Sequence, residues 1–153
     1  MNYVSYASAM TINKNTWWVN ARKSGVYTHM LRRMIAQIDA LLSHHSKIHL
    51  LRFDLHQCEF TNDNKQITDF NRRLFERIKN HYSVKRIGFI WMREIEKAKQ
   101  QHYHYVLFID GHKIQYPATI LKWAAEIWEF MDGSRYTPKN CYYQIGRNDH
   151  QKL

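Results

Sequence analysis

Glycine and proline are scarce in this chain, with five and two among 153 residues. This scarcity argues against a linker-rich or disordered protein, and neither an internal repeat nor a low-complexity run is present. Hydrophobic residues make up 44% of the chain. A chain of this length and composition can bury one good core and is too short to expect two, so we expect a single domain over residues 1–153.

Cysteine and long apolar runs are also in short supply. The two cysteines, Cys58 and Cys141, have no CxxC spacing, which argues against a disulfide scaffold or a zinc knuckle. No apolar run approaches the roughly 18 residues that a membrane span needs, and the N-terminus lacks the basic-then-apolar order of a signal peptide. We therefore expect a cytoplasmic protein with no membrane partner.

Acidic residues are outnumbered, with 13 Asp and Glu against 23 Lys and Arg, for a net charge of +10. The imbalance is strongest in residues 1–53, where the only acid is Asp39. Such asymmetry in a small domain favours a polyanionic partner, most often nucleic acid. A basic surface that serves solubility alone is the alternative.

Hydrophobic periodicity separates helices from strands, because apolar side chains recur every three or four residues in an amphipathic helix and every second residue in a strand. Asn64 is the expected cap of the second helix, and Gly133 is expected to end the third. The predicted elements are a helix at 26–44, a strand at 48–56, a helix at 67–82, strands at 86–96 and 102–110, a helix at 117–131 and a strand at 140–146.

Without the first helix, this order is strand, helix, strand, strand, helix, strand. It is the split β-α-β order of a ferredoxin-like α+β sandwich, with one antiparallel sheet and its helices on one face. The first helix is then an N-terminal addition. Such an architecture hosts many functions, so the fold by itself names none.

The stretch HYHYV at residues 102–106 suggests a metal site. His102 and His104 lie on one face of their predicted strand. A five-residue connection, 97–101, pairs Glu94 with His104 across the hairpin, and directly opposed residues share a face. One carboxylate and two imidazoles suit Mg²⁺ or Mn²⁺, with the imidazoles favouring manganese. A chance pair of surface histidines is the alternative, since the chain has ten.

Three stretches carry a resemblance to a known family: LRFDLH at 51–56, the helix at 67–82 and WMREIEKAKQQHYHYVLFIDG at 91–111. The chain resembles the replication initiators of filamentous phages (inovirus type) and related prophage proteins, which belong to the HUH endonuclease superfamily, where U is a hydrophobic residue. This resemblance implies a rolling-circle initiator that nicks one DNA strand at an origin through a tyrosine. It also implies a divalent cation at the site.

The nucleophilic tyrosine departs from the superfamily's usual pattern. There it usually lies on a helix after the HUH strand, but ATILKWAAEIWEFM contains no tyrosine. Tyr142 and Tyr143 are the candidates within the chain, and ordinary strand positions explain them as well. The alternatives are a nucleophile beyond Leu153, or a nucleic-acid-binding remnant or mobile-element accessory protein that binds a host protein and does not nick DNA.

Basic residues near these strands are candidates for contacts with single-stranded or origin DNA. Arg52 and His56 share the non-core face of the strand at 48–56 with Asp54, and a solvated or salt-bridged face explains them equally well. The candidate nucleic-acid-binding residues are Arg52, His56, Arg93, Lys97 and Lys99.

Overall fold

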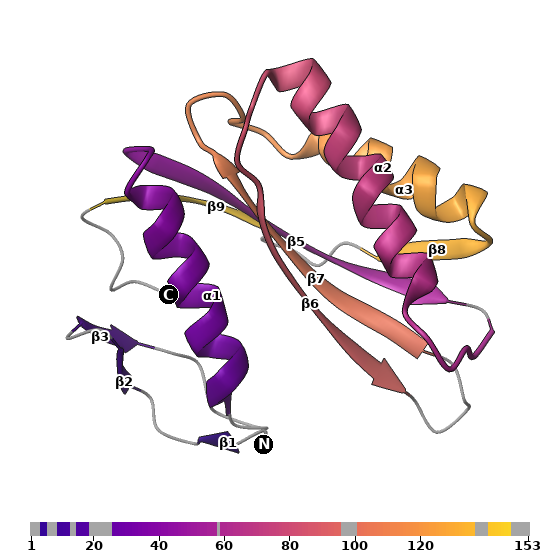
Figure 1. The fold of residues 1–153 in the computed structure, drawn as a ribbon, viewed down its shortest axis with the longest axis horizontal. Coiled ribbons are helices and arrows are strands. Elements are labelled where there is room, and N and C mark those ends of the chain that lie inside the picture. The colour runs from indigo at the N-terminus through magenta and orange to yellow at the C-terminus, as the bar shows by residue number, and fades with distance from the viewer. Residues whose placement is uncertain are drawn as a thin grey trace.

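A computed structural model describes residues 4–5, 9–12, 15–18, 26–57, 59–95, 101–136 and 141–147. The protein has an α+β fold in which three helices pack on an open antiparallel sheet of five strands (Figure 1). Within these described ranges, none of the helices combines the length and the apolar character that crossing a membrane would take.

The helices and strands follow the predicted order, with short strands added before the first helix and one strand added before the last. The helices are α1 (Thr28–Leu42), α2 (Lys65–Tyr82) and α3 (Ala118–Phe130). The main sheet contains β5 (Lys47–Gln57), β6 (Gly88–Ile95), β7 (Gln101–Asp110), β8 (Gly133–Tyr136) and β9 (Tyr142–Gly146). The short N-terminal strands are β1 (Val4–Ser5), β2 (Ala9–Ile12), β3 (Asn15–Trp18) and β4 (Val26–Tyr27), paired as β1 with β4 and β2 with β3.

β5 is the central strand of the main sheet. The strand order is β6-β7-β5, and β8 and β9 share the remaining edge of β5. β8 pairs with residues 54–57, β9 pairs with residues 47–51, and every pairing is antiparallel. The sequence predicted β9 but not β8, because Gly133 was interpreted as the end of a helix. In the structure α3 ends at Phe130 and Gly133 begins a strand.

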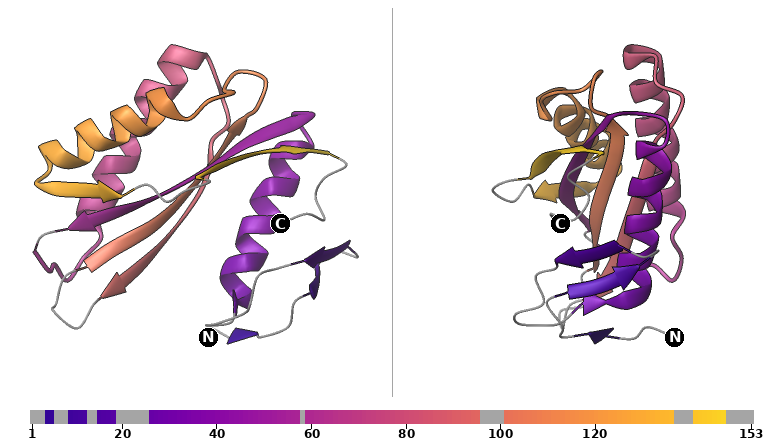
Figure 2. Two further views of the ribbon diagram at one scale, coloured as in Figure 1. Left: turned by 180° about the vertical axis from the view of Figure 1, so that it is seen from behind. Right: turned by 90° about the vertical axis from the view of Figure 1, so that its left-hand side faces the viewer.

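The two faces of the sheet carry two separate apolar clusters. Odd-numbered residues of β5 and β7, such as Phe53 and Tyr105, pack with α2 and α3. Even-numbered residues at one end of the same strands, such as Leu50 and Phe108, pack with α1. α2 and α3 therefore share one face, as expected for the split β-α-β unit, and the additional helix α1 covers part of the other face. Figure 1 and the left panel of Figure 2 show α2 and α3 next to one another at one end of the sheet, with α1 at the other end.

The expected cap of α2 is confirmed in position but not in its side-chain contact. Asn64 occupies the N-cap position but its side chain makes no capping hydrogen bond. Its Oδ1 instead accepts a hydrogen bond from the hydroxyl of Tyr103, 3.1 Å away. The loop before α2 is thereby joined to β7.

Candidate functional site

The hairpin of β6 and β7 differs in register from the prediction. Glu94 pairs with His102, and Met92 pairs with His104. β6 ends at Ile95 and β7 begins at Gln101, so the connection lies one residue earlier than expected. The observed pairing is therefore shifted by two residues from the predicted one. A shift of two residues leaves every side chain on the same face of the sheet. Glu94, His102 and His104 therefore share one face, as predicted.

A single carboxylate oxygen lies between the two imidazoles. His104 Nε2 is 2.6 Å from Glu94 Oε2, and His102 Nε2 is 3.9 Å from the same oxygen. The two rings are 5.6 Å apart, centroid to centroid. Three side chains from two neighbouring strands thus converge on one point above the sheet.

A second carboxylate reaches this group from β5. Asp54 is the direct partner of His104 in the sheet, and its Oδ1 lies 2.9 Å from His104 Nδ1. A carboxylate that accepts a hydrogen bond from one ring nitrogen of a histidine fixes the direction in which the second ring nitrogen points. This arrangement is common around metal-binding histidines. The alternation of β5 predicted that Asp54 lies on this face of the sheet. Its contact with His104 depends on the register of β5 with β7, which the sequence did not specify. We call Asp54, Glu94, His102 and His104 the cluster.

Hydrogen bonds within the cluster shift the pKa values of His104 and Glu94 toward the charged forms. Partial burial lowers the pKa of His104, but hydrogen bonds to Glu94 and Asp54 outweigh this effect, so its pKa lies above the ordinary value. The hydrogen bond from His104 lowers the pKa of Glu94 despite the opposing effect of burial. His104 therefore keeps its proton to a higher pH than an isolated histidine does, and Glu94 stays ionised to a lower pH than an isolated glutamate does.

The cluster is open to solvent on one side. The side chain of His102 is 12% exposed, that of His104 41% and that of Glu94 56%. His56, the partner of His102 in the sheet, packs its ring edge-on at 4.9 Å. The exposed carboxylate of Glu94 can turn without disturbing the core.

A metal ion bound to both histidines would require the Glu94 carboxylate to leave His104 Nε2. Two imidazoles and a carboxylate are suitable donors for a borderline divalent cation. Among the described residues, however, no group of three or more His, Cys, Asp or Glu is arranged to hold a metal ion. Glu94 Oε2 lies 2.6 Å from His104 Nε2, the nitrogen that a metal ion would need.

The basic candidates fall into three groups. Arg52 is exposed on the face of the cluster, two residues before Asp54. Arg93 lies on the opposite face, donates hydrogen bonds to Gln101 Oε1 at 2.6 Å and to the Thr61 carbonyl, and thus anchors the loop after β5. A phosphate contact by Arg93 remains a prediction. Residues 97 and 99, both lysines, lie outside the described residues.

Neither candidate tyrosine lies at the cluster. Tyr142 is on the face of α2 and α3, where its ring stacks on His49 at 5.4 Å. Tyr143 is on the face of the cluster but pairs with Leu50, four residues before Asp54 and so about 13 Å away along the strand. That separation exceeds the reach of a tyrosine side chain. The backbone of Tyr136, in contrast, pairs directly with Asp54.

The family model of the YagK/YfjJ C-terminal domain matches residues 9–152. The chain belongs to this family. The matched range includes the whole main sheet, the three helices and every residue of the cluster. No curated protein and no solved structure matches the chain. The family description names no activity, so the resemblance to phage replication initiators remains a prediction.

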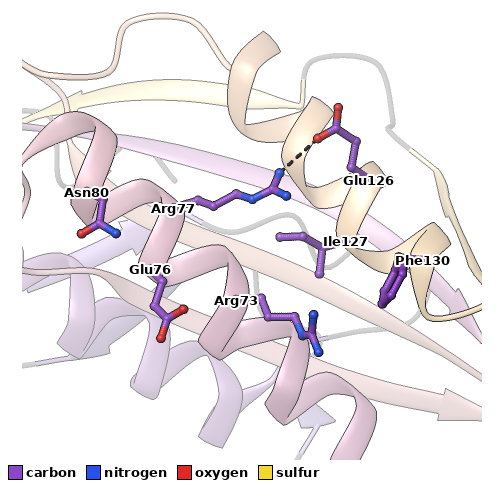
Figure 3. Close-up of a pocket in the computed structure, with 7 residues that line it drawn as sticks. All are labelled: Arg73, Glu76, Arg77, Asn80, Glu126, Ile127 and Phe130. Carbon is purple, nitrogen blue, oxygen red and sulfur yellow. Dashed lines mark hydrogen bonds and ion pairs between the residues drawn. The ribbon is translucent and has the colours of Figure 1, made fainter.

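This domain also has a groove between α2 and α3, on the other side of the sheet. It has a volume of about 480 Å³, and Figure 3 shows Arg77 of α2 bound to Glu126 of α3 across it, 3.0 Å apart.

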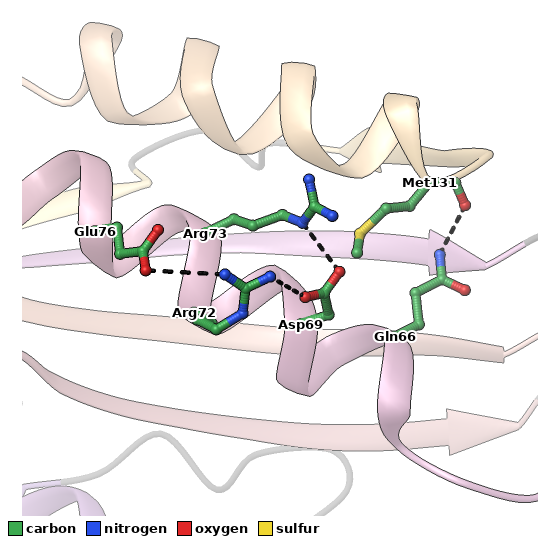
Figure 4. A network of polar contacts seen from close by, with 6 residues as sticks. All are labelled: Gln66, Asp69, Arg72, Arg73, Glu76 and Met131. Carbon is green, nitrogen blue, oxygen red and sulfur yellow. Dashed lines mark hydrogen bonds and ion pairs between the residues drawn. The ribbon is translucent and has the colours of Figure 1, made fainter.

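Figure 4 shows Asp69 of α2 bound to Arg72 and Arg73, at 2.6 and 2.9 Å. Because these cations are already paired with acids, the groove has no strong preference for an anion. It contains none of the predicted site residues.

Proposed function

We propose that this protein is an HUH-type DNA endonuclease and strand transferase that initiates rolling-circle replication by nicking single-stranded DNA at an origin. The observation that carries the proposal is the convergence of His102 and His104 on one oxygen of Glu94. These are the three ligands that the spacing along the hairpin predicts, and the side chains of His104 and Glu94 are 41% and 56% exposed.

The topology supports the same proposal. The chain order from β5 to β9 is strand, helix, strand, strand, helix and then two short strands that share one edge. The first strand is central and the third lies beside it, antiparallel. This is the arrangement of a split β-α-β, ferredoxin-like sheet, which the resemblance to HUH endonucleases also implies.

His102, His104 and Glu94 would hold Mg²⁺ or Mn²⁺. Such a cation, when bound, polarises the scissile phosphate and offsets charge on its oxygens. The residues of the chain have to prepare the site. Asp54 keeps the Nδ1–H of His104 engaged, which directs the lone pair of Nε2 outward once Glu94 turns.

The reaction that we propose is a transesterification. A tyrosine hydroxyl attacks the phosphorus, a bond forms between the phenolic oxygen and phosphorus, and the bond to the 3′ oxygen breaks. The phenolic proton is transferred, in net terms, to the departing 3′ hydroxyl. The phosphotyrosine stores the energy of the broken ester for later rejoining. The nucleophile would be Tyr136, whose backbone pairs with Asp54, or a tyrosine beyond Leu153.

One observation favours a second candidate function, a nucleic-acid-binding protein without nicking activity. Tyr142 and Tyr143, the tyrosines proposed from the sequence, lie away from the cluster. The net charge of +10 supports binding to a polyanion with or without catalysis. In this case the cluster would contact nucleic acid and cut nothing.

The test is a covalent adduct. We would incubate the protein with Mn²⁺ and a pool of random-sequence single-stranded oligonucleotides carrying a dye at the 3′ end, then separate the products on a denaturing gel. We expect a dye-labelled protein band that disappears in H102A/H104A. The matched control is H112A, because His112 is exposed and bonds Ser46 at the far end of β5.

The outcomes separate the two candidates. An adduct that persists in H102A/H104A would overturn the nuclease proposal. Binding of the oligonucleotides with no adduct at any Mn²⁺ concentration would favour the second candidate. If an adduct forms, its loss in Y136F would identify Tyr136 as the nucleophile, and Y142F and Y143F are the controls because these tyrosines lie away from the cluster.

A further inference from the structure

Two exposed side chains lie on the sheet face that carries the cluster. Arg52 precedes Asp54 by two residues on β5 and points to the same side of the sheet. Tyr143 of β9 is the direct partner of Leu50 and shares that side too, and 50% of its surface is exposed. Tyr143, Arg52 and the cluster therefore follow one another along β5.

Both side chains lack partners within the described part of the chain. Among the described residues, none forms a hydrogen bond or ion pair with the guanidinium of Arg52, and none stacks a ring on Tyr143. Its neighbour Tyr142 differs, since that ring is stacked on His49. An aromatic ring and a cation that are exposed and close together are available to a ligand.

The spacing suits a bound strand better than catalysis. Tyr143 lies about 13 Å from Asp54 along the sheet, which is too far for its hydroxyl to reach a phosphate held at the cluster. Arg52 lies between them, about 7 Å from Asp54. A single strand that crosses the cluster would place a neighbouring phosphate beside Arg52 and an unstacked base over Tyr143.

We propose that Tyr143 and Arg52 form a binding subsite for single-stranded nucleic acid, in which Tyr143 stacks on a base and Arg52 contacts the backbone. The proposal rests on the proposed function only for the direction in which the strand continues, toward the cluster. Charge complementarity supports this occupant, since Arg52 has no acid paired with it among the described residues and the chain carries a net charge of +10. An aromatic ring beside a cation is the usual platform for single strands.

The test measures binding without metal or cleavage. Fluorescence anisotropy with dye-labelled oligo(dT) of about 15 nucleotides, in EDTA, reports affinity alone. We expect Y143A to weaken binding at least about fivefold, while Y143F stays within about twofold because its ring still stacks. We expect R52A to weaken binding and to lower the salt slope by about one. Y116A is the matched control, since Tyr116 is 71% exposed and lies in the loop before α3.

Several outcomes would overturn the subsite: no binding of oligo(dT) by the wild-type protein, unchanged binding by Y143A, an equal loss in Y143F and Y143A, or equal affinity for a duplex of the same length. Circular dichroism and thermal unfolding show whether each variant is folded. The adduct assay is separate: loss of the adduct in H102A/H104A with unchanged oligo(dT) binding by Y143A would support the nuclease and overturn only the subsite.

Discussion

Glu94 accepts a hydrogen bond from His104, 2.6 Å away, although its direct partner in the sheet is His102. The contact is diagonal across the hairpin, so one carboxylate serves both histidines. Asp54 approaches His104 from the other side. The His104 side chain on β7 therefore contacts side chains of both β5 and β6 on this face. Its pKa depends on the carboxylates that those two strands supply.

We predict that E94Q lowers the pKa of His104, because the hydrogen bond to the Glu94 carboxylate is the strongest effect that raises it. D54N should lower it as well. The measurement is an NMR titration of the His104 ring proton, with E129Q on the exposed part of α3 as the control. An unchanged pKa in both variants would show that the ion pairs seen here do not form in solution.

The same interaction predicts how stability depends on pH. The folded-state pKa of His104 is raised, so its ion pairs stabilise the fold fully below its ordinary pKa of 6.5. This contribution is lost as the pH rises through the raised folded-state value. Urea unfolding from pH 6 to pH 9 should show a decline that is reduced in H104Q, and equal declines in both proteins would contradict the prediction.

We predict that His49 makes the fold sensitive to acid. Its ring is fully buried, and burial lowers its pKa to about 4. Its Nδ1 accepts a hydrogen bond from the Gln144 amide, 2.8 Å away. If His49 were protonated, its Nδ1–H would face the N–H of Gln144, and this hydrogen bond would be lost. The unfolded chain binds this proton near pH 6.5, so stability falls from there down to about pH 4.

The control for this prediction is H49N, which keeps an acceptor for Gln144 but cannot be protonated. Between pH 7 and pH 5 the wild-type protein should lose about 2 kcal/mol more unfolding free energy than H49N, as measured by urea titration. Equal losses would mean that His49 is already protonated or accessible in the folded state.

We predict that G133A destabilises the domain by roughly 1–3 kcal/mol. An added Cβ would fall on the indole ring of Trp128, which is fully buried. That indole donates a hydrogen bond to the carbonyl of His56, 2.8 Å away. Chemical denaturation measures the loss, with S134A at the exposed neighbour as control. If G133A is as stable as S134A, Trp128 has room to move.

We predict that Q37A both destabilises the domain and exposes a sheet edge. The Gln37 amide donates to the Phe89 carbonyl at 2.6 Å and accepts from the Phe89 N–H at 2.5 Å, so it replaces a neighbouring strand at the edge of β6. Loss of both bonds should cost about 1–3 kcal/mol. Light scattering should detect association through the freed edge, while Q115A, at an exposed position, should remain unaffected.

The sequence predicts the strands and helices whose apolar spacing is regular. The alternation in β5 and the stripe of Ile67, Phe70 and Leu74 in α2 each place one face in the core, and the structure confirms both. The parity argument for Glu94 and the two histidines also holds, because parity survives a register error of two residues. Features that depend on partners distant in the chain escape this reasoning.

Three differences illustrate that limit. The register of the hairpin depends on where β6 ends, which no local signal marked. β8 is only four residues long and too short for alternation to show. The contact between Asp54 and His104 depends on residues 50 positions apart, and on a pairing of β5 with β7 that periodicity does not specify.

Among the described residues, the two apolar clusters have no member in common: one lies beneath α2 and α3, the other beneath α1. Each layer can therefore open without the other, so amide hydrogens in α1 and in α2 should exchange with deuterium at different rates. A strand bound beside α1 would slow exchange in that layer first. Protection confined to α1 would then report occupancy of this face before any bond is cut.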